Sequence, residues 1–161
     1  MSKRSVSLWI VGIVILIILS AGFAFYRASI SALDEPGQFE TALATKGKHI
    51  IVGHQAAKMH VTELPYSDAS ADTGAIVFSV ECTACHGKDG RSPTHIGQSM
   101  YPRVPDLGSP EVQKWSNIEL FWIVQHGIRL SGMPGFEKFN TEEQSWHLVH
   151  FIRTLPNHPK Q

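Results

Sequence analysis

The sequence of 161 residues is poor in several features that large classes of protein require. It has only two cysteines and no second cysteine pair, which disfavours a structural zinc site. Its 14 basic and 14 acidic residues leave no net charge, and no basic patch predicts a nucleic-acid surface. No segment alternates apolar and polar residues convincingly, and no internal repeat is visible. The length allows one domain and an appendage, but not two full domains.

Both cysteines lie in one short run, Cys82-Thr83-Ala84-Cys85-His86. This C-x-x-C-H spacing is typical of covalent attachment of a c-type haem, with each thiol bonded to one vinyl arm of the porphyrin. A redox dithiol of the thioredoxin kind is the alternative, but that motif should follow a strand, whereas the preceding residues indicate a helix. The run therefore predicts one haem c bound covalently by Cys82 and Cys85, with His86 as an axial ligand of the iron.

A second axial ligand is expected at Met133, in the run Gly132-Met133-Pro134-Gly135. A thioether is a common partner of histidine on haem iron, and His/Met ligation raises the reduction potential. The flanking glycine and proline predict an extended loop with little bulk, where a core-filling methionine would sit at helical spacing instead. Met100 and His126 are the competing candidates for the sixth position.

The pocket around this haem is predicted from loop positions. The carbonyl of Pro105, two residues before Leu107, can accept the second ring N–H of His86, although an ordinary proline turn explains the same residues. Four side chains are candidate polar partners for the haem propionates: Tyr101, Arg103, Trp122 and Arg129. The two arginines are equally well explained as solvated surface residues. Surface positions are expected for His95, His147, His150 and His158, and a position at the domain edge or against a partner for Trp146.

Three helices are predicted around the motif. The second and third each begin with a capping box, Ser116-x-x-Glu119 and Thr141-x-x-Gln144. Glycine favours the end of the second helix and proline the end of the third. The expected limits are Thr73 or Gly74 to the motif, Ser116 to Gly127, and Thr141 to Pro156.

The N-terminal part reads as a membrane anchor. Residues 8–26 carry no charged side chain, and this stretch of about 19 residues just spans a hydrocarbon core of about 30 Å. Lys3 and Arg4 precede it, which keeps that end cytoplasmic and places the rest across the membrane. A cleaved signal peptide is the alternative, although its apolar core is usually only about 7–15 residues long. Either interpretation places the remaining chain outside the cytoplasm.

The chain is thus divided into residues 1–27, a cytoplasmic N-terminus and transmembrane anchor, residues 28–71, a connecting segment, and residues 72–161, a haem domain. In the connecting segment a short helix is expected to begin near Pro36, and Gly47 and Gly53 disfavour its continuation. An irregular stretch should follow. This segment is expected to contact the haem domain or a membrane partner, or to serve only as a spacer.

Residues 72–156, about half of the chain, resemble the class I cytochrome c domain. The matching residues are Gly74, Phe78, the run C-T-A-C-H-G at 82–87, Pro105-x-Leu107, Gly132-Met133-Pro134 and Leu148-x-x-Phe151-Ile152. The resemblance implies an all-α fold in which three main helices surround a covalent haem. It also implies that Gly74 meets Phe151 at a helix crossing, that Pro105 bonds the proximal histidine, and that Met133 binds the iron.

Together these features predict a membrane-anchored electron carrier on the periplasmic side of a bacterial inner membrane. It would pass single electrons between a donor and an acceptor redox protein, without a small-molecule substrate and without enzymatic activity of its own. A dedicated cytochrome subunit of a larger respiratory or dehydrogenase complex is the alternative. A haem gas sensor or a peroxidase with an open sixth site is a third hypothesis.

Overall fold

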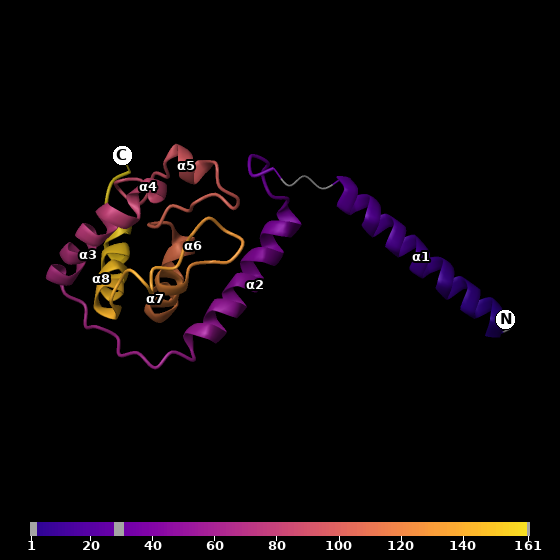
Figure 1. The fold of residues 1–161 in the computed structure, drawn as a ribbon, viewed down its shortest axis with the longest axis horizontal. Coiled ribbons are helices and arrows are strands. Elements are labelled where there is room, and N and C mark those ends of the chain that lie inside the picture. The colour runs from indigo at the N-terminus through magenta and orange to yellow at the C-terminus, as the bar shows by residue number, and fades with distance from the viewer. Residues whose placement is uncertain (1–2, 28–30, 161) are drawn as a thin grey trace. The chain divides into compact units, whose positions relative to one another are not determined.

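The computed structural model describes residues 3–27 and 31–160, and every regular element within them is a helix (Figure 1). The all-helical architecture expected from the sequence is therefore confirmed. The chain divides into two compact units, Met1–Asp34 and Glu35–Gln161. Each unit is described by itself below.

The first unit is built from one helix, α1 (Lys3–Arg27). Its stretch Ser7–Arg27 has 21 residues and a mean hydropathy of 2.7, and its side chains are exposed throughout. By length and composition such a helix can cross a bilayer, and a secretory signal sequence meets the same description. The apolar N-terminal helix is confirmed, whereas its insertion in a membrane stays a prediction.

The second unit is organised around α3 (Asp68–Glu81) and α8 (Glu142–Thr154), which pack side by side (Figure 1). A third helix, α7 (Asn117–His126), packs on α8. The side chains at the centre of this packing are almost completely shielded from solvent: Phe78, Phe121, Leu148, Val149 and Leu155. These are the three main helices that the sequence predicts around the motif.

Local capping residues determine where the main helices begin. Both expected capping boxes are formed, with the Ser116 and Thr141 side chains accepting from the third residue of α7 and α8. The first helix begins at Asp68, earlier than the expected Thr73 or Gly74. The cause is Ser67, whose hydroxyl accepts a hydrogen bond from the Ser70 amide at 3.1 Å and caps the helix there.

The connecting segment is more ordered than expected, because α2 (Gln38–Ala56) continues through both glycines. Its buried residues are Val52 and Ala56, and the ring of His49 stacks on Trp115 with centroids 3.7 Å apart. A Cβ at Gly53 would lie 3.1 Å from the carboxylate of Glu119, so the helix passes closely over α7 at this point. α2 is therefore packed against α7, within the compact unit that begins at Glu35.

Two side chains expected at the surface lie inside the core. Trp146 is 2 % exposed and stacks on Phe121, with ring centroids 4.3 Å apart. His150 is 1 % exposed, and its Nδ1 lies 2.6 Å from the Ser70 hydroxyl. Both expectations were wrong because α8 is covered by α3 on one side and by α7 on another, so its buried face is wider than its apolar stripe.

Candidate functional site

The attachment motif forms a single turn of helix directly after α3. Cys82 ends α3 and precedes α4 (Thr83–His86), and its carbonyl accepts hydrogen bonds from the Cys85 amide at 3.2 Å and the His86 amide at 2.9 Å. Both cysteines are free thiols. Burial, with smaller contributions from Glu81 and Cys85, raises the pKa of Cys82 to about 12, so this thiol is held in its neutral form. One turn thus presents two thiols and an imidazole together.

The imidazole of His86 is neutral, and its capacity for hydrogen bonds is only partly used. Burial lowers its pKa to about 4, against an opposing contribution from the Pro105 carbonyl that raises it. The Nδ1 atom is buried and forms no full hydrogen bond with the residues that the structure describes. The Pro105 carbonyl is therefore the backbone group that acts on this ring, at the position where the sequence places an acceptor for its N–H.

The loop after the motif folds back onto it. The Thr94 amide donates to the Cys85 carbonyl at 3.1 Å, and the Thr94 hydroxyl donates to the Ala84 carbonyl at 2.7 Å. At Gly97, in the short helix α5 (His95–Gln98), a Cβ would lie 2.4 Å from the same Cys85 oxygen. Only glycine allows α5 to approach the motif backbone this closely.

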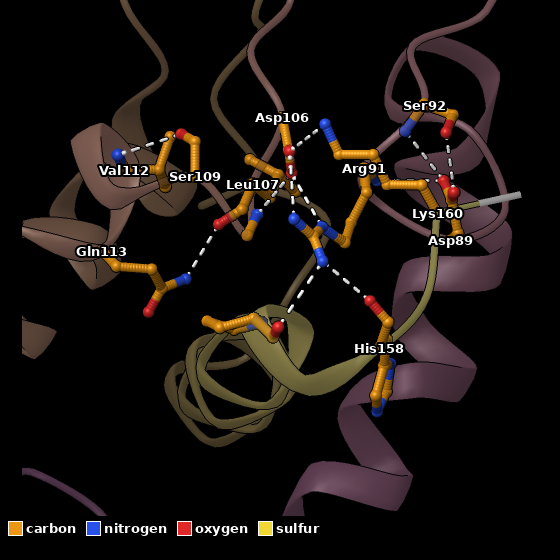
Figure 2. A network of polar contacts seen from close by, with 12 residues as sticks. Asp89, Arg91, Ser92, Asp106, Leu107, Ser109, Val112, Gln113, His158 and Lys160 are labelled. Carbon is orange, nitrogen blue, oxygen red and sulfur yellow. Dashed lines mark hydrogen bonds and ion pairs between the residues drawn. The ribbon is translucent and has the colours of Figure 1, made fainter.

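A polar network fixes the segment that carries Pro105 (Figure 2). The guanidinium of Arg91 donates to both carboxylate oxygens of Asp106, at 3.2 and 3.3 Å. The Leu107 amide donates to the Gly90 carbonyl at 3.0 Å, and the Leu107 carbonyl accepts from Gln113 in α6 (Pro110–Gln113) at 2.8 Å. The loop directly after the attachment motif is thereby joined to the later loop that carries Pro105. The sequence contains no local signal for this pair, since 15 positions separate the two charges.

The loop that carries Met133 is fastened to the end of α7. Gly127 adopts φ +67°, and a Cβ there would lie 2.6 Å from the Met133 carbonyl oxygen. The Met133 amide donates to the Ser131 hydroxyl at 3.2 Å, and the Met133 carbonyl accepts from Ile128 at 3.3 Å. The side chain of Met133 is partly buried against the hydrophobic core. Its main chain is thus held from both sides.

The two competing ligands have different surroundings. Met100 lies beside this loop, since a Cβ on Gly132 would be 2.5 Å from the Met100 sulfur. His126, at the end of α7, stacks on Trp122 with centroids 4.9 Å apart, and its Nδ1 lies 3.1 Å from the Trp122 carbonyl. The His126 side chain therefore contacts its own helix, whereas the Met100 thioether lies beside the loop that carries Met133.

The remaining pocket candidates are dispersed. The Tyr101 hydroxyl donates to the Glu40 carboxylate of α2, and Arg103 pairs with Glu35 at 3.3 Å. Both side chains therefore contact the segment before and within α2. Arg129 is exposed to solvent, and the Trp122 ring stacks on His126. No local sequence pattern predicts the contacts to Glu40 and Glu35, since more than 60 positions separate the partners.

Residues 69–152, just over half of the chain, match the family described as cytochrome C oxidase, cbb3-type, subunit III. The chain belongs to this family. Its second unit therefore contains a cbb3-type cytochrome c domain, a haem electron carrier whose cofactor is haem c. The matched range begins in α3 and ends in α8, so α2 lies outside it.

Two solved structures are similar to this cbb3-type cytochrome c domain. A chain of the Kuenenia stuttgartiensis reducing HAO-like protein complex Kustc0457/Kustc0458 has a TM-score of 0.54 and 19% identity, over 58% of this chain and 47% of that chain. This chain spans about half the length of that relative, and the likeness shows a shared fold. The KustC0563 c-type cytochrome has a TM-score of 0.46 and 26% identity, over 51% of this chain and 95% of that chain. No curated protein matches the sequence significantly.

The residues present fit a covalent haem. Two free thiols stand at the attachment spacing on one turn, and the next residue is a neutral histidine whose Nδ1 is buried without a full hydrogen bond. A proximal haem ligand needs this combination, a neutral ring that offers one nitrogen to iron and the other N–H to a nearby acceptor.

Proposed function

We propose that this protein is a membrane-anchored cytochrome that carries single electrons on the periplasmic side through one haem bound by Cys82 and Cys85. The observation that carries the proposal is the buried Nδ1 of His86, next to the Pro105 carbonyl and directly after two free thiols. When bound, the haem supplies one-electron chemistry at its iron. The protein's part is to attach it, hold both axial positions and exclude water.

We assign the axial positions to His86 and Met133. The hydrogen bonds on the Met133 main chain support this choice. A loop fixed in this way would keep the ligand in the same position in the ferric and the ferrous states. Met133→Ala should abolish the sulfur–iron absorption band of the ferric protein, and Met100→Ala should keep it. The opposite pattern would transfer the assignment to Met100.

A redox titration followed by spectroscopy on the intact protein tests the proposal as a whole. We expect one haem per chain, a low-spin ferric spectrum and a reduced protein that does not bind carbon monoxide. A high-spin spectrum, or carbon monoxide binding, would favour an open sixth site and hence a sensor or a peroxidase.

The anchor is supported by α1, whose apolar side chains are exposed along Ser7–Arg27. N-terminal sequencing of the protein from its membrane fraction tests it. A mature chain that retains residues 1–27 supports an anchor, whereas a start at residue 25 or 32 would mean that the helix is a cleaved signal.

A second candidate function is that of a fixed subunit in a larger oxidoreductase complex. The family description names an oxidase subunit, and α2 exposes four large apolar side chains to solvent, namely Phe39, Leu43, Ile50 and Ile51. Purification in mild detergent separates the two functions. A stable stoichiometric complex supports the subunit, and a lone cytochrome supports the free carrier.

A further inference from the structure

Arg91 joins three segments that are distant in the sequence (Figure 2). It lies in the loop after the attachment motif, and its guanidinium reaches both oxygens of Asp106. A third nitrogen donates to the His158 carbonyl at 2.7 Å, in the C-terminal tail. A planar guanidinium can hold a carboxylate with two parallel hydrogen bonds, so the pair fixes orientation as well as distance.

Asp106 is suited to transmit this constraint because it directly follows Pro105. Its side chain is only 18% exposed and also accepts from the Gly108 amide at 2.8 Å and from Lys160 at 3.0 Å. Burial opposes its ionisation, but the hydrogen bonds from Arg91, Lys160 and Gly108 outweigh burial and hold its pKa below the usual value. The carboxylate therefore stays charged and tied at neutral pH.

We propose that the Arg91–Asp106 ion pair positions the Pro105 carbonyl against His86, and so sets how strongly His86 donates electrons to the haem iron. The inference rests on the proposed function. Arg91 is a positioning residue in this scheme, because it acts on the ligand only through Asp106 and the Pro105 peptide.

The direction of the effect follows from ligand chemistry. A well-placed acceptor for the Nδ1–H makes the imidazole more basic, which favours ferric iron and lowers the reduction potential. A loosened Pro105 peptide should therefore raise the potential. A simple loss of the Arg91 charge would act in the other direction, because a nearby positive charge favours the ferrous state.

The experiment uses Arg91→Lys in the intact holoprotein, since this change keeps the charge and removes the two-pronged contact. We expect a higher reduction potential than in the wild type. We also expect the His86 Nδ1–H, followed by proton NMR, to exchange with solvent roughly ten times faster, which corresponds to about 1.4 kcal/mol of lost protection. Arg91→Gln should raise the potential as well, although it removes a positive charge.

Lys160→Gln is the matched control. It removes the outer contact to Asp106 and loosens the same tail, but it leaves the contact between Arg91 and Asp106 intact. Its Nδ1–H exchange should match the wild type.

An unchanged potential and unchanged exchange in Arg91→Lys would overturn the inference, and so would a lower potential in Arg91→Gln. Asp106→Asn gives a second test if Arg91→Lys does not fold, with faster exchange expected and wild-type exchange again overturning the inference. A wild-type protein without covalent haem would overturn the proposed function and this inference together, so the two failures are distinguishable.

Discussion

Gly74 and His147 meet at the crossing of α3 and α8 with no side chain between the two backbones. A Cβ at position 74 would lie 1.9 Å from the His147 carbonyl oxygen and 2.9 Å from the Cβ of Phe151. The sequence expectation of a contact between Gly74 and Phe151 is thereby confirmed. The helix that leads into the attachment motif and the last helix of the fold are locked together at this point.

Gly74→Ala should destabilise the protein by about 1–3 kcal/mol or more, because the new methyl group collides with backbone that cannot move aside. Gly47→Ala is the matched control, since nothing lies within 4 Å of a Cβ there and the position is also helical. That change should stabilise the protein by up to about 1 kcal/mol through helix propensity. Urea unfolding of both variants measures the difference, and equal effects would contradict the close crossing.

Val52→Ala should show that α2 belongs to the fold of the haem domain. Val52 is 3% exposed, so the lost contacts and the cavity should cost about 1–3 kcal/mol. Its neighbour Ile51 is 60% exposed, and Ile51→Ala should change stability by less than about 0.5 kcal/mol although it removes a larger side chain. If denaturant midpoints of the two variants agree, α2 is not packed as described.

His150 should make the protein less stable in mild acid. Burial lowers its pKa, and nearby His147 lowers it further, while the Leu64 carbonyl and Glu63 act in the opposite direction. Below about pH 6.5 the unfolded chain therefore binds a proton that the folded protein does not. The free energy of unfolding should fall as the pH drops from about 7 until the pKa of folded His150 is reached.

The slope of stability against pH is the measurement, because His150→Asn also changes the absolute stability. Denaturant unfolding across this range should give a flatter dependence in His150→Asn than in the wild type. His95→Asn removes an exposed imidazole and should keep the wild-type slope. A wild-type slope in both variants would mean that His150 takes up its proton in the folded protein as readily as in the unfolded chain.

Arg153→Lys should be costly even though the charge is kept. The guanidinium donates to Asn117 at 2.8 Å, to the carbonyl and the side chain of Gln113 at 3.1 Å each, and to the Trp115 carbonyl. An ammonium group cannot reproduce this fork, and the expected loss is about 1–3 kcal/mol. Arg129→Lys, at an exposed position, should have almost no effect. Thermal unfolding of the two variants provides the comparison.

The features that the sequence predicted well are those that are completed within a few residues. The capping boxes at Ser116 and Thr141 close within one turn, and the spacing of Cys82, Cys85 and His86 is itself local. Such signals need no knowledge of the rest of the fold.

The features that it could not predict depend on distant segments meeting. The pair of Glu35 with Arg103 and that of Arg91 with Asp106 form only once loops from different parts of the chain are in place. The burial of His150 was not predicted for a related reason, since its contact with the Ser70 hydroxyl forms only where α3 packs on α8. The roles of the haem ligands stay predictions, because a ligand set requires the bound group.

The packing of α2 also sets the size of the piece that could be moved into another protein. The family match begins at residue 69, but a chain cut there would lose the helix over Trp115 and both carboxylates that hold Tyr101 and Arg103. An engineer who wished to graft this cytochrome onto a different anchor or enzyme would therefore make the junction ahead of Glu35 and carry α2 along with the haem domain.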